Sequence, residues 1–241
     1  MTQQIKFVDF PALEHASPEG LLAMGGELDQ NTIISAYAQG IFPWFSEEQP
    51  VLWWSPNPRL VLYPKEFKLS RSLRKKIRNK GFELAANQQF SEVIAACAMR
   101  GADTLEDAPE DTWITSGMRQ AYISLHNNSY AHSIEVSLEG RLVGGLYGIA
   151  LGSVFFGESM FSRSSDASKV ALFALCQWLQ EKQFKLIDCQ VSSSHLLSLG
   201  AREIDRSSFI SALDQIDIQQ ADNKFNLGFE QYWSENVIKS L

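Results

Sequence analysis

Apolar residues recur every four positions between residues 69 and 77, where Leu69, Leu73 and Ile77 form a single stripe. This spacing puts them on one side of an α-helix and leaves polar residues on the other sides. Gly81 follows directly, and helices commonly end at a glycine. The pattern therefore predicts a helix over residues 70–80 with a charged outer face.

The second half of the chain shows the shorter period that is typical of β-strands. Residues 133–138 alternate, Glu139 and Gly140 form a turn, and residues 141–149 return as a second strand. Further elements are expected as a strand over 153–159, a helix over 166–182, a strand over 186–191, a short helix over 193–199 and a strand at 203–204. This is the element order of the N-acetyltransferase-like fold, so we expect an α+β protein with a mostly antiparallel central sheet.

Residues 1–60 are interpreted as a small N-terminal domain that precedes a catalytic domain over residues 61–241. A helix is expected between Asp29 and Gly40, which suit its two ends. Prolines and tryptophans follow at close spacing and exclude a regular helix. Within this stretch Trp44 is interpreted as an aromatic stacking platform, while Trp53 and Trp54 fit a platform or a packed linker equally well.

Three polar residues interrupt apolar strands of the predicted sheet. Glu158 follows two phenylalanines and lies between a glycine and a serine, where a carboxylate needs a partner for its charge. Asp188 and Gln190 are two positions apart on one strand, so we expect their side chains on one face and Cys189 on the other. Together these groups predict a site near the ends of neighbouring strands.

Charge is distributed unevenly along the chain, which has a net charge of -7. Residues 65–80 hold eight basic residues and one acidic residue, and this helix lacks alternating acidic partners for i,i+4 pairs. A basic segment on an acidic protein can hold a polyanion locally through phosphate contacts. We therefore expect nucleic-acid binding by Arg71, Arg74, Lys75 and Arg78, with a merely solvated face as the alternative.

Cysteines and histidines give no sign of a disulfide framework or a metal centre. The three cysteines are far apart, as expected of reduced thiols, and the four histidines lack the spacing of metal ligands. No apolar run approaches the ~18 residues that suggest a membrane span, and residues 1–6 lack the apolar stretch of a signal peptide. We expect a cytoplasmic protein that binds no metal, no cofactor and no membrane.

Seven short motifs then occur in an order that carries a family resemblance. They are Phe42-Pro43-Trp44-Phe45, Trp53-Trp54-Ser55-Pro56, Trp113-Ile114-Thr115, His132-Ser133-Ile134-Glu135-Val136, Gly157-Glu158-Ser159-Met160-Phe161-Ser162, Ala167-Ser168-Lys169 and Asp188-Cys189-Gln190. With these motifs the chain resembles the leucyl/phenylalanyl-tRNA–protein transferases over roughly residues 17–210. The resemblance implies a small N-terminal domain followed by an acetyltransferase-like domain, in agreement with the expected element order.

The resemblance also implies a reaction. Members of this family move leucine or phenylalanine from aminoacyl-tRNA to the N-terminal amine of proteins that begin with arginine or lysine. The modified proteins are marked for N-end-rule degradation. The expected partners are therefore an aminoacyl-tRNA and a protein substrate, and we expect a monomer. Because the aminoacyl ester is already activated, the reaction needs no ATP.

Site residues follow from the same resemblance. Asp188 and Gln190 form the catalytic pair, in which Gln190 holds the amine and Asp188 polarises it or accepts its proton. Glu158 is expected to orient the amine or the basic N-terminal residue, with pairing to a nearby cation as the alternative. Trp44 and Trp113 resemble the residues that sandwich the terminal adenosine of the tRNA. Leu146, Phe155, Leu172 and Leu175 match the apolar pocket for the transferred side chain, or are plain core.

Three other functions fit parts of the sequence less well. In a coenzyme A–dependent acetyltransferase the pyrophosphate needs a glycine-rich turn, but residues 161–169 contain no glycine. This turn also holds the acidic Asp166, which would repel a pyrophosphate. The leucyl/phenylalanyl-tRNA–protein transferases usually have asparagine at this position. A hydrolase that uses Cys189 and His195 is disfavoured because Cys189 should face the core. A non-catalytic tRNA-binding module would leave Glu158, Asp188 and Gln190 without a purpose.

Overall fold

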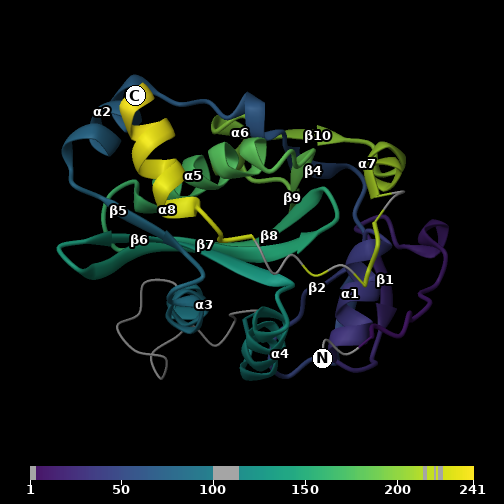
Figure 1. Cartoon of the computed structure of the whole chain (residues 1–241). Coiled ribbons are helices and arrows are strands. Elements are labelled where there is room, and N and C mark those ends of the chain that lie inside the picture. Colours follow the sequence, from purple (N-terminus) through teal and green to yellow (C-terminus); the bar gives the residue numbers. More distant parts are fainter. Residues whose placement is uncertain (1–3, 100–113, 214–215, 220, 222–224) are drawn as a thin grey trace.

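A computed structural model describes residues 4–99, 114–213, 216–219, 221 and 225–241 (Figure 1). A seven-stranded sheet runs through its centre in the order β10–β4–β9–β8–β7–β6–β5. Neighbouring strands are antiparallel, except that β8 and β9 are parallel. The strands are β4 (Arg59–Leu62), β5 (Glu83–Ala86), β6 (Ala131–Leu138), β7 (Arg141–Leu151), β8 (Val154–Ser162), β9 (Leu186–Gln190) and β10 (Arg202–Ile204).

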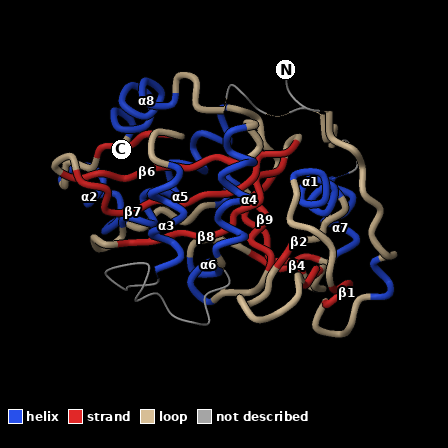
Figure 2. The backbone as a smooth tube through the Cα atoms, turned by 90° about the horizontal axis from the view of Figure 1, so that it is seen from below, coloured by secondary structure: helices blue, strands red, loops and turns tan. Residues whose placement is uncertain are grey.

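Helices cover both faces of this sheet (Figures 1 and 2). One apolar core packs α2, α5 and α8 against one face, and a second core packs α1, α3, α4 and α7 against the other. Helix α5 connects β8 to β9, because two parallel strands need a long crossover. The helices are α1 (Gln30–Ala38), α2 (Arg71–Asn79), α3 (Phe90–Met99), α4 (Ser116–Asn127), α5 (Ala167–Glu181), α6 (Ser194–Ser198), α7 (Arg206–Leu213) and α8 (Phe229–Tyr232).

The first part of the chain adds a small sheet of its own. Strands β1 (Leu21–Met24), β3 (Leu52–Trp54) and β2 (Phe42–Pro43) pair in that order. Asp29 caps α1 by accepting a hydrogen bond from the Thr32 backbone, as its position in the sequence predicted. Trp53 is buried and donates its indole N–H to the Gly25 carbonyl, so it is a core residue.

The predicted order of elements is confirmed. The elements form close to their expected positions, namely the β6–β7–β8 meander, α5, β9, α6 and β10. Helix α2 is the helix predicted over residues 70–80, and it is one residue shorter at each end. The division expected at residue 60 falls inside β4, which belongs to the central sheet, and it stays a prediction. The C-terminal segment had no assigned role, and it packs Phe225, Phe229 and Trp233 into the α5 core.

A close approach of α5 to β7 depends on Gly144. A Cβ atom at this position would overlap with the Cβ of Ala167 and lie 3.0 Å from its carbonyl carbon. Because both atoms belong to the start of α5, the helix would have to move away from the sheet. The small residue therefore sets how deeply α5 sits on the sheet.

We expect Gly144→Ala to lower the stability of the protein by about 1–3 kcal/mol, the usual cost of overpacking a close contact. Thermal unfolding followed by circular dichroism measures the change. Gly117→Ala is the control, because a Cβ there would meet its nearest neighbours at 3.8 Å and alanine favours a helix. An equal melting temperature for wild type and Gly144→Ala would contradict this account.

Candidate active site

A cavity of about 100 Å³ opens between α5 and strands β7, β8 and β9. Its wall includes all four residues expected to form an apolar pocket, namely Leu146, Phe155, Leu172 and Leu175. Apolar cavities of about 150 Å³ admit a benzene-sized ligand. At about 100 Å³ this cavity is smaller than that, and its size suits one aliphatic side chain.

Polar groups reach the same cavity from β8 and β9. Glu158 and Gln190 line its wall, whereas Asp188 is fully buried and is not one of the lining residues. Gln190 has a φ of +58°, so the regular alternation of side chains expected from Asp188 to Gln190 does not hold at this strand end. As a result Gln190 and Cys189 both line the cavity.

Asp188 is held by a bidentate ion pair with Arg59. Nε and Nη2 of Arg59 donate to Oδ1 and Oδ2 of Asp188 over 2.8 and 2.7 Å, and both side chains are fully buried. The backbone N–H of Gln190 donates to the same Oδ1 over 3.0 Å. Both carboxylate oxygens are therefore engaged, and one of them also holds the turn that carries Gln190.

Arg59 was not recognised from the sequence. Its guanidinium lies 4.8 Å from the ring centre of Phe42 and 4.6 Å from that of Phe209. The two aromatic rings and the Asp188 carboxylate therefore take the place of the water that would surround an exposed guanidinium. Its Nη1 has no hydrogen-bond partner among the described residues. The available signal was an arginine at the head of the apolar run Leu60-Val61-Leu62, because a charge in a buried strand requires a partner.

Glu158 is bound by two tyrosines from different helices. The hydroxyl of Tyr37 in α1 lies 2.7 Å from Oε1, and that of Tyr122 in α4 lies 2.9 Å from Oε2. The two hydroxyl oxygens lie 2.6 Å from each other. Burial raises the pKa of Glu158 to about 8, although hydrogen bonds from the tyrosines oppose this rise. Neither tyrosine was predicted from the sequence to be a partner of Glu158.

The tryptophans differ in their surroundings. Trp44 is 44% exposed, and its ring centre lies 5.7 Å from that of Trp54. The indole N–H of Trp54 donates to the Trp44 carbonyl over 2.7 Å, which fixes the loop. Trp44 thus offers an aromatic face to solvent, as expected of a stacking residue. Trp113 lies outside the described residues.

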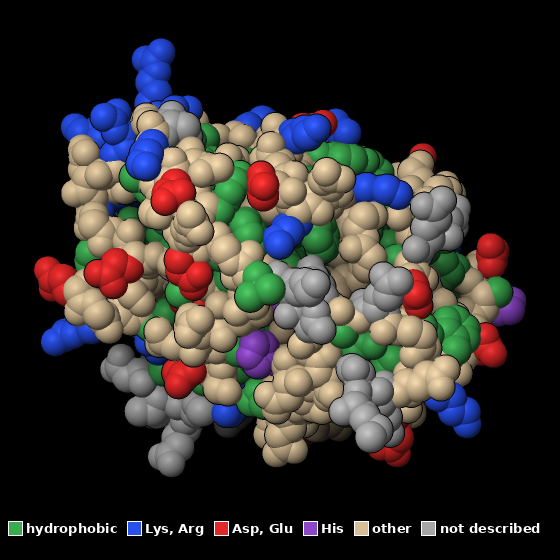
Figure 3. All heavy atoms as spheres, in the orientation of Figure 1, with side chains coloured by type: hydrophobic (Ala, Val, Ile, Leu, Met, Phe, Trp, Pro, Cys, Tyr) green, Lys and Arg blue, Asp and Glu red, His purple; other side chains and the backbone are tan. Residues whose placement is uncertain are grey.

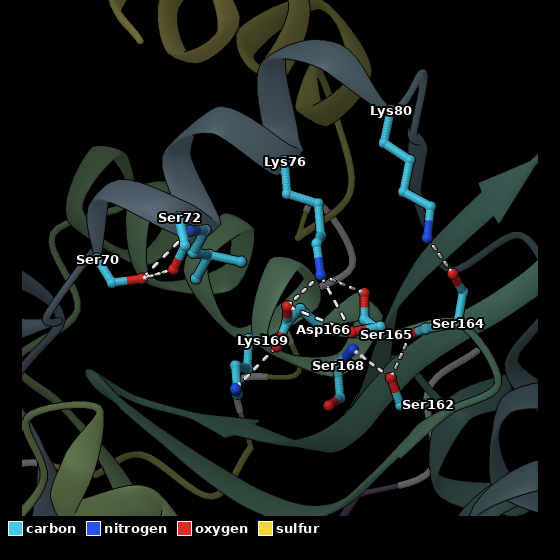
Figure 4. Close-up of polar contacts among 11 residues, drawn as sticks. Ser70, Ser72, Lys76, Lys80, Ser162, Ser164, Ser165, Asp166, Ser168 and Lys169 are labelled. Atoms are coloured by element: carbon cyan, nitrogen blue, oxygen red, sulfur yellow. Dashed lines mark hydrogen bonds and ion pairs between the residues drawn. The ribbon is translucent and has the colours of Figure 1, made fainter.

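Helix α2 separates its basic residues by direction. Arg71, Arg74, Lys75 and Arg78 are exposed, and lysine and arginine side chains gather over α2 at the upper left of Figure 3. Lys76 of α2 and Lys80, which directly follows the helix, turn instead towards the start of α5 (Figure 4). The outer face is therefore free to meet a polyanion.

Asp166 joins α2 to α5. Its carboxylate forms ion pairs with Lys76 and with Lys169, the latter over 2.8 Å (Figure 4). Hydrogen bonds from Lys169 and Lys76 lower the pKa of Asp166 to about 2. The carboxylate thus neutralises the lysines that a pyrophosphate would need at this helix start, which weakens the coenzyme A alternative.

The cysteine-hydrolase alternative also loses support. Cys189 is 9% exposed, and burial raises the pKa of its thiol far above the usual range. A thiol in such surroundings does not supply the thiolate that nucleophilic catalysis requires.

Two family models match the chain. The model of the leucyl/phenylalanyl-tRNA protein transferase matches residues 61–214, and the model of its N-terminal domain matches residues 26–57. The chain belongs to this family. Family membership makes it an aminoacyltransferase, and hence an enzyme, as the motifs predicted.

Two relatives show how far the similarity extends. A leucyl/phenylalanyl-tRNA–protein transferase of Aromatoleum aromaticum is 54% identical over 207 residues, which cover 85% of each chain. One of Chromohalobacter salexigens is 56% identical over 210 residues, which cover 86% of this chain and 80% of the relative. The solved structure of L-PGS from Bacillus licheniformis shares 9% identity and covers 69% of this chain and 52% of that chain, and its TM-score of 0.39 is too low to carry an argument.

None of the helices in the described part of this transferase combines the length and the hydrophobicity that crossing a membrane requires. Within the same residues, no three histidine, cysteine, aspartate or glutamate side chains are grouped so that they could hold a metal ion.

Breaking the buried ion pair of this transferase should be costly. We expect Arg59→Met to lower the unfolding free energy by about 3–5 kcal/mol, because it leaves the Asp188 charge buried without a partner. The double variant Arg59→Met/Asp188→Leu removes both charges and should recover most of this loss. Urea unfolding at neutral pH measures both values. A single variant that is at least as stable as the double variant would contradict the assignment.

Proposed function

We propose that the protein transfers leucine or phenylalanine from aminoacyl-tRNA to the N-terminal α-amine of proteins that begin with arginine or lysine. The observation that carries this proposal is the apolar cavity whose wall also contains Glu158 and Gln190. A cavity for one apolar side chain beside polar groups suits an aminoacyl ester, whose side chain needs a dry pocket and whose reacting carbonyl needs hydrogen bonds. Membership in the family supports the same reaction.

The apolar wall selects the transferred residue. Leu146, Phe155, Leu172 and Leu175 receive the leucyl or phenylalanyl side chain. A smaller side chain leaves part of the cavity empty. Each missing methylene weakens binding in the transition state by about 1–3 kcal/mol, and this difference discriminates against the smaller residue. Charged or strongly polar side chains are rejected because the wall offers them few partners.

The polar wall handles the incoming amine. A free α-amine has a pKa of roughly 8, so near neutral pH a weak base is enough to remove its proton and make it nucleophilic. Gln190 holds the amine through its side-chain amide, and Asp188 supports this arrangement through the Gln190 backbone. Much of the rate enhancement then comes from positioning two already reactive groups.

Outside the cavity, the tRNA is held by stacking and by charge. Trp44, together with Trp113, stacks on the terminal adenosine, and each stacked base contributes about 1–3 kcal/mol. Arg71, Arg74, Lys75 and Arg78 contact phosphates of the acceptor stem. This reaction takes place in the cytoplasm, where a monomer marks its protein substrates for ATP-dependent degradation.

The experiment that tests this function is transfer of radiolabelled leucine from leucyl-tRNA to a peptide that begins with arginine. We expect label on this peptide and none on the same peptide with an acetylated N-terminus, because only a free amine can attack the ester. Leucyl-tRNA that is bound without any transfer would leave the non-catalytic binding module as the better explanation.

A pair of variants in α5 adds a test of the pocket to this experiment. Leu175→Ala enlarges the cavity, whereas Leu179→Ala, one turn further on, removes an equally buried side chain outside its wall. Each should cost about 2–5 kcal/mol of stability. We expect Leu175→Ala alone to raise the preference for phenylalanine over leucine. The expected change is about tenfold, which corresponds to about 1.4 kcal/mol of differential binding. An equal shift in both variants would contradict the pocket.

The outer face of α2 gives a separate prediction on tRNA binding. Arg74→Ala/Lys75→Ala should weaken binding and reduce the slope of log K against log salt by about 0.7–0.9 for each lost phosphate contact. The control is Lys6→Ala, which removes an exposed lysine whose backbone contacts Asn31 of α1, at the other end of the molecule from α2 (Figures 1 and 2). Affinity is measured by filter binding at several salt concentrations. Equal slopes for wild type and the double variant would rule out the outer face of α2 as a site of phosphate contacts with the tRNA.

A further inference from the structure

The hydrogen bonds around Glu158 require a count of protons. Three short O···O contacts connect Tyr37, Tyr122 and the two oxygens of Glu158, at 2.6, 2.7 and 2.9 Å. Each contact of this length needs a hydrogen between its oxygens, since two oxygens without one repel each other. The two phenols supply two hydrogens. The third has to come from the carboxyl group, so the ring is complete when Glu158 is a neutral carboxylic acid.

The other charged or titratable groups around Glu158 fit this protonation state. Tyr147 of β7 lies in the same buried cluster and its hydroxyl has no partner among the described residues. Burial raises the pKa of this hydroxyl well above the usual range, and a negative charge on Glu158 raises it further, so Tyr147 offers that charge no cation. The Asp188 carboxylate raises the pKa of Glu158 and the Arg59 guanidinium lowers it. Since Arg59 and Asp188 form a pair, their effects on Glu158 oppose each other.

Asp188 is poorly suited to receive a proton from the substrate. Its Oδ1 accepts from Arg59 Nε and from the Gln190 backbone, and its Oδ2 accepts from Arg59 Nη2. The side chain is fully buried and is not among the residues that line the cavity. Protonation would break a bidentate pair and leave the Arg59 charge unbalanced. Glu158, by contrast, lines the cavity.

We propose that Glu158 is the group that exchanges protons with the substrates during transfer, while the Arg59–Asp188 pair only positions Gln190. This inference rests on the proposed function. The neutral amine nitrogen forms a bond to the ester carbonyl carbon, and the bond from this carbon to the 3′ oxygen of the tRNA breaks. Glu158 gives its proton to the leaving 3′ oxygen and receives the proton that the nitrogen loses. At the end Glu158 is again neutral, and no other reactant is needed.

The ring with the tyrosines suits Glu158 to this exchange. General acid–base catalysis is most efficient when the pKa of the group lies near the working pH, and burial brings the pKa of Glu158 to about 8. Tyr37 and Tyr122 can follow the change, because their hydroxyls rotate and redistribute the hydrogens of the ring.

The pH profile of transfer tests this role. Below pH 8 the rate should rise with pH, because the α-amine loses its proton, and above about pH 8 it should fall, because Glu158 ionises. Glu158→Gln keeps a donor and an acceptor in the ring, so it should fold. We expect it to lower kcat by about a hundredfold or more and to abolish the fall above pH 8. Rates are corrected for ester hydrolysis without enzyme. A Glu158→Gln profile with the wild-type fall would overturn the assignment.

Variants of the ion pair separate positioning from proton exchange. Arg59→Lys and Asp188→Asn should lower kcat but leave the fall near pH 8 in place, because neither residue exchanges the proton. Should Asp188→Asn unfold, Arg59→Lys still gives this readout, since lysine keeps the charge. Loss of the alkaline fall in either folded variant would instead identify Asp188 as the exchanging group.

Infrared difference spectra of the protein alone give a readout that does not require activity. We expect a carboxylic-acid carbonyl band that disappears as the pH passes about 8 and that Glu158→Gln lacks. Glu135, whose pKa burial raises to about 7, contributes equally to both proteins. Wild type without transfer but with this band would reject only the proposed function, whereas transfer without the band would reject only the role of Glu158.

Discussion

The site depends on one buried ion pair, because neither of its charges can stay in the interior without the other. Arg59 lies on β4 and Asp188 on β9, and these strands are neighbours in the sheet although 129 residues separate the pair in the sequence. A bidentate pair of this kind tolerates little displacement, so it holds the strands in one register. Through the Gln190 backbone it also fixes the turn that forms one side of the cavity.

Sequence patterns predicted the elements well, because periodicity is a local property. The meander, α5 and β9 formed where alternation and helical spacing indicated, and the four apolar pocket residues were brought together. The ion-pair partner Arg59 and the tyrosines around Glu158 were missed, since they come from β4, α1 and α4. Tyr37 lies 121 residues from Glu158, and no spacing rule predicts such a contact. The short strand β4 was not predicted, because prolines flank it at positions 58 and 64.

Helix α2 connects recognition outside the cavity to the cavity itself. Its exposed arginines and Lys75 carry uncompensated charge, while Lys76 and Lys80 turn inward to Asp166 and to Ser164, in the turn before α5. Since α5 also supplies Leu172 and Leu175 to the cavity wall, the basic face and the pocket are parts of one packed unit. A tRNA held on this face therefore approaches the cavity in a restricted set of positions.

The two acidic residues of the site differ because their partners differ. Asp188 faces a guanidinium and stays in an ion pair, whereas Glu158 faces two phenols that cannot balance a charge. This difference matters for the nucleophile. An ionised carboxylate beside the cavity would stabilise the protonated, unreactive amine and raise its pKa. A neutral acid avoids that penalty and still offers a hydrogen to the departing oxygen, so the burial that disfavours a charge on Glu158 also leaves the amine free to react.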